Sequence, residues 1–341
     1  MVFKMMGFRF VASTAESGGP ILNFYQLLQH LSKFNVYADT FVVLNTDQSD
    51  MGKKRVLFVV NPISGGKKKK GFEKRALEDL DTSLYDAEFV CTQYANHAYE
   101  LGAEAVADGV DVVVAVGGDG TINEIASALN GTSTALGIVP EGSGNGLALY
   151  LGIPLNERAA VRRLNRMESM VIDSGSINGL LFFNMAGIGF DASVSDRFAN
   201  DNIRGAIGYL KAVMTEISTY KPQHYRLTID GQSLEREALM ISVANSPQYG
   251  NNAHVAPQAS VTDGILDVCI IHKFPLYIFP MMVFHLFNKT ADQSEYVEII
   301  PGRQIRIVRE SADAVHVDGE PKALGPVLDI EVNPSTLRII C

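Results

Sequence analysis

The chain has no tryptophan, only three cysteines and fewer basic than acidic residues. Cys91, Cys269 and Cys341 lie far apart and form no Cys-x-x-Cys pair. This pattern argues against a zinc ribbon or a disulfide framework and predicts reduced thiols in the cytoplasm. A net charge of −9 also disfavours a general nucleic-acid binder.

No stretch is long and apolar enough to predict a membrane-spanning helix. The most apolar one, residues 270–287, is interrupted by Lys273, Pro275 and Pro280. The N-terminus also lacks the pattern of a secretory signal. We therefore expect a soluble, cytoplasmic protein, whose 341 residues and 47% hydrophobic content allow two domains.

Residues 1–52 show no sustained periodicity, whereas an apolar run begins directly after Arg55. We predict that these residues form an extension outside the main fold, with a docked helix as the alternative.

A unit of apolar strand, glycine-containing loop and amphipathic helix recurs three times between Arg55 and Pro154. Its strands are predicted at residues 56–60, 110–116 and 135–139. Such alternation predicts a Rossmann-like parallel sheet with helices on its faces. The helical spacing gives the core positions of the first two helices, namely Phe72, Ala76, Leu77, Leu80, Ile122, Ile125, Ala126 and Leu129.

Beyond residue 173 the pattern changes to short alternating segments separated by turn residues, which predicts an antiparallel β domain. The clearest strands are residues 225–229, 239–244, 265–271 and 304–308. Helices are expected over residues 203–218 and 277–287.

The three glycine loops, residues 61–66, 117–121 and 140–145, each follow a predicted parallel strand. Since the carboxyl ends of such strands meet at one edge, the loops should converge on one ligand. Glycine lets the backbone approach phosphate, and loop and helix N–H groups donate to it. A nucleoside triphosphate is the expected ligand.

Two common phosphate sites do not fit these loops. Gly66 to Gly71 is followed by Phe72, where a Walker A loop requires lysine and a hydroxyl residue, and the third loop lacks the full dinucleotide-binding glycine pattern. The second loop instead contains an acid, Asp119. An acid beside phosphate predicts a bridging Mg²⁺.

Together these motifs resemble the diacylglycerol kinase catalytic family, which includes sphingosine and ceramide kinases. The resemblance lies in Asn61-Pro-x-Ser-Gly65, Gly117-Gly-Asp-Gly-Thr121 with Asn123 and Glu124, and Gly142-Ser-Gly-Asn145. Residues 182–191, 263–267 and Asp318-Gly-Glu320 agree with it as well. The similarity covers residues 54–341.

The resemblance implies that residues 53–173 form an α/β nucleotide-binding domain, as in NAD and diacylglycerol kinases, completed by a tail of about residues 323–341. Residues 174–322 would form an antiparallel β-sandwich that receives the lipid, with the active site in the cleft between the domains. By motif, the residues expected at ATP are Asn61, Pro62, Ser64, Gly65, Thr92, Gly117, Gly118, Asp119, Gly120, Thr121, Asn123, Glu124 and Ser143.

The resemblance also implies the catalytic acids. Phosphoryl transfer needs a carboxylate that accepts the proton of the acceptor hydroxyl, and Asp318 and Glu320 are the candidates. We favour Glu320 as the base, with Asp318 orienting it and Asp119 near the phosphates. A second, structural Mg²⁺ would be held by the side chains of Ser260 and Asp263 and the carbonyl of Ile265.

Two features have alternative interpretations. Lys67 to Lys70 could attract ATP or an anionic membrane, or could form an ordinary solvated face. The apolar residues 274–287 could form a lip that touches a membrane, or could pack in the core.

We therefore expect an ATP- and Mg²⁺-dependent lipid kinase that meets its substrate at the membrane surface and converts diacylglycerol to phosphatidic acid. A sphingoid base or ceramide is the alternative acceptor. A kinase for a soluble acceptor such as NAD, or a catalytically silent nucleotide-binding regulator, is the competing interpretation. The sequence does not indicate an oligomeric state.

Overall fold

The computed structural model describes residues 2–5, 8–11, 52–66, 69–190, 217 and 220–341. The chain divides into two compact units, Met1–Met51 and Gly52–Cys341. In the first, β1 (Val2–Met5) and β2 (Phe8–Val11) pair as an antiparallel hairpin. Except for residue 217, the helix expected over residues 203–218 lies outside the described residues, as does the remainder of the predicted N-terminal extension.

The second unit begins with a parallel sheet, as the sequence predicts. Its order is β4–β3–β5–β6, and all three pairings are parallel. The strands are β3 (Lys54–Val60), β4 (Tyr85–Cys91), β5 (Val112–Gly117) and β6 (Ala135–Pro140). Every residue of β5 and β6 is buried, because helices cover both faces of a parallel sheet. Strand β4 lies at the edge of the described sheet and is partly exposed, so its residues show less of the continuous apolar pattern of a buried strand.

In the described part of the chain, five α-helices accompany this sheet. They are α2 (Phe72–Asp79), α3 (His97–Ala107), α4 (Asp119–Leu129), α5 (Gly146–Tyr150) and α6 (Glu157–Leu164). The four predicted core positions of α4 are all buried. The expectation for Leu77 was wrong: it is 40% exposed, because the short helix α2 packs through Phe72 and Ala76 instead.

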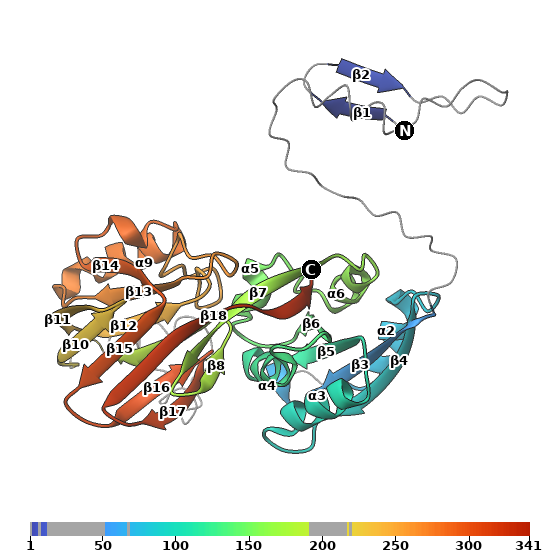
Figure 1. Cartoon of the computed structure of the whole chain (residues 1–341), viewed down its shortest axis with the longest axis horizontal. Coiled ribbons are helices and arrows are strands. Elements are labelled where there is room, and N and C mark those ends of the chain that lie inside the picture. Colours follow the sequence, from blue (N-terminus) through green and yellow to red (C-terminus); the bar gives the residue numbers. More distant parts are fainter. Residues whose placement is uncertain (1, 6–7, 12–51, 67–68, 191–216, 218–219) are drawn as a thin grey trace. The chain divides into compact units, whose positions relative to one another are not determined.

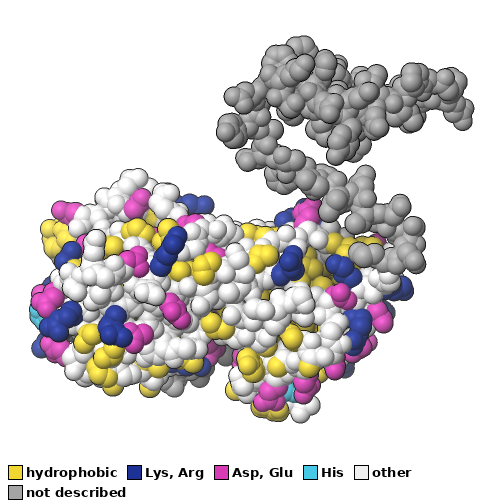
Figure 2. All heavy atoms as spheres, in the orientation of Figure 1, with side chains coloured by type: hydrophobic (Ala, Val, Ile, Leu, Met, Phe, Trp, Pro, Cys, Tyr) yellow, Lys and Arg dark blue, Asp and Glu magenta, His cyan; other side chains and the backbone are white. Residues whose placement is uncertain are grey.

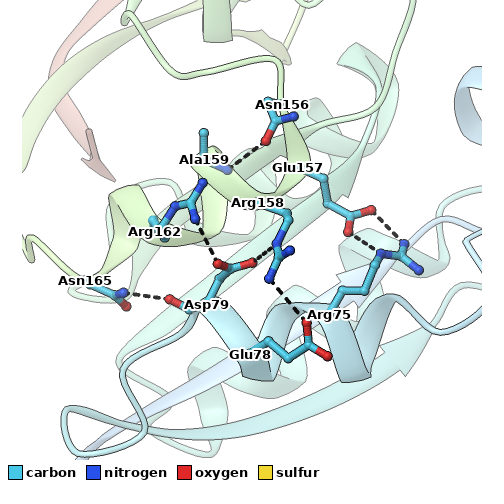
Figure 3. Close-up of polar contacts among 9 residues, drawn as sticks. All are labelled: Arg75, Glu78, Asp79, Asn156, Glu157, Arg158, Ala159, Arg162 and Asn165. Carbon is cyan, nitrogen blue, oxygen red and sulfur yellow. Dashed lines mark hydrogen bonds and ion pairs between the residues drawn. The ribbon is translucent and has the colours of Figure 1, made fainter.

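Ion pairs join α2 to α6 (Figure 3). The Arg75 guanidinium donates to both carboxylate oxygens of Glu157, at 2.7 and 2.8 Å. Asp79 accepts from Arg158 at 2.6 Å and from Arg162 at 3.1 Å. A two-pronged arginine–carboxylate pair fixes orientation as well as distance. The helix that follows the first glycine loop is thereby fixed to α6, the second helix after the third loop.

The remaining strands form the predicted antiparallel β-sandwich. One sheet has the order β14–β13–β12–β9–β16–β17, and the other contains β11–β10–β15–β18, with β7 paired to β18 and β8 paired to β7. The aliphatic side chains between these layers form a separate core. The strands are β7 (Ser169–Ile177), β8 (Leu180–Phe182), β9 (Met185–Gly189), β10 (Gln223–Ile229), β11 (Gln232–Ala238), β12 (Met240–Ala244), β13 (Leu266–Ile271), β14 (Val297–Gly302), β15 (Gln304–Arg309), β16 (Asp313–Val317), β17 (Glu320–Leu324) and β18 (Val327–Ile340).

Strand β18 connects the two domains (Figure 1). Its first residues pair with β15 in the sandwich, and Ile339 pairs in parallel with Leu136 of β6. Its register shifts between Asn333 and Leu337, where the strand passes from one domain to the other. The tail expected to complete the nucleotide-binding domain is therefore shared between both domains.

Short helical segments follow β13, namely η2 (Leu276–Ile278), α9 (Phe279–Phe287) and η3 (Ala291–Gln293). Among the residues that the structure describes, no helix has the length and apolar character needed to cross a membrane. The face of the molecule in Figure 2 carries acidic and basic side chains in alternation, without one broad basic area.

Candidate active site

The three glycine loops meet at the carboxyl edge of the parallel sheet and line a cleft of about 550 Å³. The turn between β16 and β17 closes the cleft from the sandwich side. The cleft is lined by most residues predicted at ATP, namely Asn61, Pro62, Ser64, Gly65, Thr92, Gly118, Asp119, Gly120, Thr121, Glu124 and Ser143, and by Asp318 and Glu320. Gly117 and Asn123 are not among the lining residues.

Asn61 links the first loop to the second. Its Nδ2 donates to Thr121 Oγ1 at 2.9 Å, while its Oδ1 accepts from the backbone N–H of Ile63 at 3.1 Å. Gly65 has a φ of +66°, and a Cβ built there would overlap the carbonyl oxygen of Glu141. Only glycine allows this close approach between the first and third loops.

Lys69 is the described lysine of the basic run that reaches the first loop. Its Nζ contacts Ser64 Oγ and lies 3.3 Å from the carbonyl oxygen of Val116. Lys67 and Lys68 lie outside the described residues. One of the four lysines is therefore held beside the cleft instead of lying on a solvated face.

Asp119 joins the second loop to the third. It begins α4, and its two carboxylate oxygens accept from the backbone N–H groups of Asn145, at 2.9 Å, and Gly146, at 3.0 Å. Burial raises the pKa of Asp119, the nearby charge of Asp318 adds to the rise, and the two N–H bonds oppose it. These bonds give a structural reason for an acid at this position that the sequence pattern alone did not indicate.

Asn123 and Glu124, one turn further along α4, make different contacts. Glu124 accepts from the N–H groups of Asn96, at 3.0 Å, and Ala98, at 3.1 Å, and so holds the start of α3. Asn123 Nδ2 donates to Asp318 Oδ2 at 2.8 Å and to the carbonyl of Leu181 at 3.0 Å. Asn123 thus connects the second loop's helix to the sandwich domain.

Asp318 is buried and has a left-handed φ of 49°. Its carboxylate accepts from the N–H groups of Phe183, Asn184 and Met185, each at 2.9 Å, in addition to Asn123. Burial raises the pKa of Asp318, and these four hydrogen bonds act in the opposite direction. A carboxylate with both oxygens already occupied by donors can fix the β16–β17 turn in place.

Glu320, by contrast, is exposed and begins β17. Its Oε1 lies so close to Gly120 that a Cβ on the glycine would overlap it. The exposed acid of the sandwich domain therefore faces the second glycine loop directly. Gly319 between the two acids has a φ of +87°, which the tight turn requires.

The cleft offers oxygen donors suited to Mg²⁺, namely the carboxylates of Asp119, Glu124 and Glu320. Within the described ranges, however, no three Asp, Glu, His or Cys side chains converge closely enough to form a metal cluster. Mg²⁺ commonly binds through one or two carboxylates together with substrate phosphates. The cleft therefore fits a cation that arrives with the nucleotide.

The residues expected at the second metal lie outside the cleft, in the loop between β12 and β13. Asp263 Oδ1 accepts from the N–H of Ile265 at 3.0 Å, and Ser260 Oγ lies 3.2 Å from Thr262 Oγ1. Asp263 also lines a separate hollow of about 390 Å³, together with Asp173. The donor set contains only oxygen, as Mg²⁺ prefers, but includes a single carboxylate.

The sequence did not indicate the rim of the cleft after β4. Tyr94 lies there and stacks on the His97 ring at a centroid distance of 4.4 Å. Its hydroxyl also donates to Glu100 at 2.6 Å. It lies three residues after the end of a half-exposed strand and belongs to no motif, so only its closeness in sequence to Thr92 could have pointed to it.

These loops, opposed by an exposed carboxylate from a second domain, define a two-domain, nucleotide-dependent phosphotransferase. Residues 55–177 match the diacylglycerol kinase catalytic domain, and residues 184–341 match the YegS C-terminal NAD kinase β-sandwich-like domain. The chain belongs to the diacylglycerol kinase family and is a lipid kinase.

The relatives agree with this assignment. A protein of Pseudomonas aeruginosa named "Probable lipid kinase YegS-like" is 35% identical over 71% of this chain and 80% of its own length. A diacylglycerol kinase of Mycobacterium tuberculosis is 33% identical over 63% of this chain and 72% of its own. An uncharacterized protein of Synechocystis is 30% identical over 68% of this chain, but the match spans only 55% of that protein.

The fold is shared with a solved structure. The crystal structure of a diacylglycerol kinase from Bacillus anthracis superimposes with a TM-score of 0.66, over 85% of this chain and 98% of that one, at 21% identity. At this identity the comparison shows the common architecture alone.

Proposed function

We propose that this kinase transfers the γ-phosphate of ATP to the free hydroxyl of diacylglycerol and so produces phosphatidic acid. The observation that carries the transfer is the position of Glu320, which faces Gly120 of the phosphate loop across the cleft. The names of relatives in Bacillus subtilis and Mycobacterium tuberculosis, both diacylglycerol kinases, support this acceptor.

The floor of the cleft suits a triphosphate because it is formed by backbone. A Cβ built on Gly142 would lie 2.6 Å from the Cα of Gly118, so two loops approach each other without side chains between them. The first N–H groups of α4 have no acceptor inside the helix and point from its positive end. Mg²⁺, bound with the phosphates, would neutralise their charge.

Glu320 would act as the proton acceptor. As the lipid hydroxyl oxygen forms its bond to the γ-phosphorus, the bond from that phosphorus to the β–γ bridging oxygen breaks and ADP leaves. The hydroxyl proton passes to the Glu320 carboxylate. Asp318 holds the turn that positions Glu320, and Asp119 keeps the third loop against the second.

Asp263 has a separate role in this proposal. With Ser260 and the carbonyl of Ile265, it would hold a structural Mg²⁺ in the loop that precedes β13. The loop lies next to the interdomain strand: the N–H groups of Gly264 and of Ser335 in β18 both donate to Asp173 at 2.7 Å. A cation there would stiffen the connection between the domains.

A radiolabelled-ATP assay in the presence of Mg²⁺ tests the proposal. The acceptors are diacylglycerol, sphingosine, ceramide and NAD, the lipids being presented in mixed micelles. Labelled phosphatidic acid as the main product is the expected result. A labelled sphingoid or ceramide product would retain the lipid kinase and replace the acceptor, whereas labelled NAD alone would overturn the proposal. If no acceptor is labelled, the result would favour the alternative of a catalytically silent nucleotide-binding regulator.

A further inference from the structure

The outer face of α9 and the η2 turn before it is apolar and exposed. Five large side chains in this segment are 47–79% exposed, whereas Phe279 and Met282 on the opposite side are buried. The exposed five form what we term the α9 face, namely Leu276, Tyr277, Met281, Phe284 and Phe287.

A helix on the surface of a globular protein normally has one apolar stripe, which faces the core. Here Tyr277, Met281 and Phe284 follow one another at spacings of four and three residues, so they lie on one side, away from the buried stripe. Five of the twelve exposed large apolar side chains in the described part of the chain fall within these twelve residues. Such a concentration marks a surface that contacts an apolar partner.

The charges around this face identify the chemistry of the partner. Residues 268–291 contain no Asp or Glu, although the whole chain has a net charge of −9. Lys273 and Lys289, both exposed, flank the residues of the α9 face in the sequence. An apolar patch with aromatic side chains and flanking lysines is complementary to a lipid surface that carries anionic headgroups.

The α9 face is physically connected to the catalytic cleft. The carbonyl of Leu286 in α9 accepts from the N–H of His254 at 2.9 Å, and a few residues earlier the N–H of Asn251 donates to the carbonyl of Gly144 in the third loop at 3.3 Å. On its inner side, Met282 packs in the same small core as Met185. The N–H of Met185 is one of the donors to Asp318.

We infer that the α9 face is the surface with which this kinase docks on an anionic lipid bilayer while the acceptor lipid enters the cleft. The inference rests on the proposed function, because a lipid acceptor is what requires the enzyme to meet a bilayer. Tyr277, Phe284 and Phe287 insert among the headgroups and acyl chains, and Lys273 and Lys289 pair with the anionic headgroups. Docking holds the catalytic cleft near the lipid, so the lipid does not have to leave the bilayer completely before it reacts.

Vesicle sedimentation tests the docking. The full chain is mixed with vesicles of phosphatidylcholine alone or of phosphatidylcholine with phosphatidylglycerol. The triple variant Tyr277→Ser, Phe284→Ser, Phe287→Ser should reduce binding to the anionic vesicles at least about tenfold, because each apolar group withdrawn weakens insertion. The matched control Tyr99→Ser, Leu155→Ser, Val327→Ser removes side chains that are 41–51% exposed elsewhere and should bind like the wild type.

Substitution of the two flanking lysines provides an independent test of the docking surface. The double variant Lys273→Gln, Lys289→Asn should weaken binding to the anionic vesicles by about fivefold per lysine and leave binding to neutral vesicles unchanged. Asparagine is chosen at position 289 because Lys289 has a φ of +60°. Unchanged binding by both the triple and the double variant would overturn the inference.

A kinase assay separates this inference from the proposed function. With a short-chain diacylglycerol dissolved as monomers, the triple variant should retain wild-type turnover, while its turnover on vesicles should fall in parallel with binding. If the wild type phosphorylates the dissolved lipid but the triple variant loses nothing on vesicles, the docking surface is wrong and the proposed function stands. If the wild type binds vesicles through this face but phosphorylates no lipid, the proposed function is wrong.

A second copy of the chain is the rival occupant of the α9 face. Sedimentation-velocity measurements without lipid distinguish it: a wild-type dimer that becomes a monomer in the triple variant would assign the face to self-association and overturn the inference. A wild type and a triple variant that share the same monomeric state support the lipid surface.

Discussion

The Glu320 carboxylate, at the start of β17, lies against the backbone of Gly120, in the first turn of α4. The two residues come from different domains, and a Cβ on Gly120 would overlap Glu320 Oε1. The missing side chain of Gly120 therefore leaves room for the acid opposite and leaves the backbone of the second glycine loop uncovered. This contact closes the cleft on the side of the sandwich domain.

Replacing Gly120 by alanine should impair the enzyme without unfolding it. The added methyl group displaces the Glu320 carboxylate, and a misplacement of this kind can cost about 10²-fold in kcat/KM. Alanine is otherwise favoured over glycine in a helix, so thermal stability should not fall. In a Glu320→Ala background, Gly120→Ala should lower kcat/KM far less, because the carboxylate that the new methyl group displaces is no longer there. Gly325→Ala, where no atom lies within 4 Å of the new Cβ, is the control.

Glu320→Gln should lower kcat by about 10²- to 10⁴-fold, the usual contribution of a general base, and leave the affinity for ATP nearly unchanged. The amide keeps the size of the side chain and removes its ability to take a proton. Turnover is measured by product formation, and ATP affinity by calorimetry. Turnover within a few-fold of the wild type would remove Glu320 from the base role.

Asp318→Asn should behave differently, because Asp318 accepts four hydrogen bonds inside the protein. An amide presents its NH₂ group to some of those donors, which should lower the free energy of unfolding by about 1–3 kcal/mol. Urea denaturation measures this loss, which Glu320→Gln should not share. A stable Asp318→Asn enzyme that is inactive would instead make Asp318 the base.

The apolar runs sufficed to predict three of the four parallel strands and the glycine loops that follow them, because strands buried on both faces and loops whose backbones approach each other closely have little freedom of composition. Strand β4 and helix α3 were missed, since an edge strand keeps exposed polar positions and α3 has only a modest apolar stripe. The family resemblance implied that the tail returns to the first domain, but not that one strand, β18, runs through both domains. This path of β18 depends on a bulge near Ser335 and on the long-range contact with Asp173.

Among the site residues, the sequence singled out acids that line the cleft, namely Asp119, Glu124, Asp318 and Glu320, but not what each one contacts. Asp119 and Glu124 both carry backbone N–H bonds from other loops, and such bonds between segments distant in sequence have no local signature. The difference between the enclosed Asp318 and the exposed Glu320, two residues apart, likewise arises only when the β16–β17 turn folds against residues 183–185.

Because the pKa of Asp119 is raised, we expect the affinity for ATP to depend on pH. Only the ionised carboxylate accepts both N–H bonds of the third loop, so ATP affinity should begin to fall at a higher pH than an exposed aspartate would give. Asp119→Asn should weaken ATP binding and abolish this acid limb, while titration of ATP itself affects both proteins alike. Calorimetry across acidic to neutral pH measures both profiles, and identical limbs would contradict the assignment.

The free energy of unfolding of the wild type relative to Asp119→Asn should change with pH in the opposite direction to the affinity for ATP. A carboxyl group whose pKa is raised by folding stabilises the protein most below its unfolded pKa, and this contribution is lost as the pH rises through the folded value. The unfolding free energy of the wild type relative to Asp119→Asn should therefore be highest at acidic pH and decline toward neutrality. Urea denaturation at several pH values checks the sign.

Asp263→Ala should reduce the stabilisation of the protein by Mg²⁺. If Asp263, Ser260 and the Ile265 carbonyl hold the ion, Mg²⁺ at about 100 times its dissociation constant would add about 2.7 kcal/mol to the wild type. In a thermal melt without nucleotide this corresponds to an upward shift of several degrees, which the variant should lack. Asp119→Ala is the matched control, because its carboxylate lies in the other cavity, and it should keep the shift. Equal shifts in the wild type and Asp263→Ala would reject a metal in this loop, whereas loss of the shift only in Asp119→Ala would place the ion in the catalytic cleft.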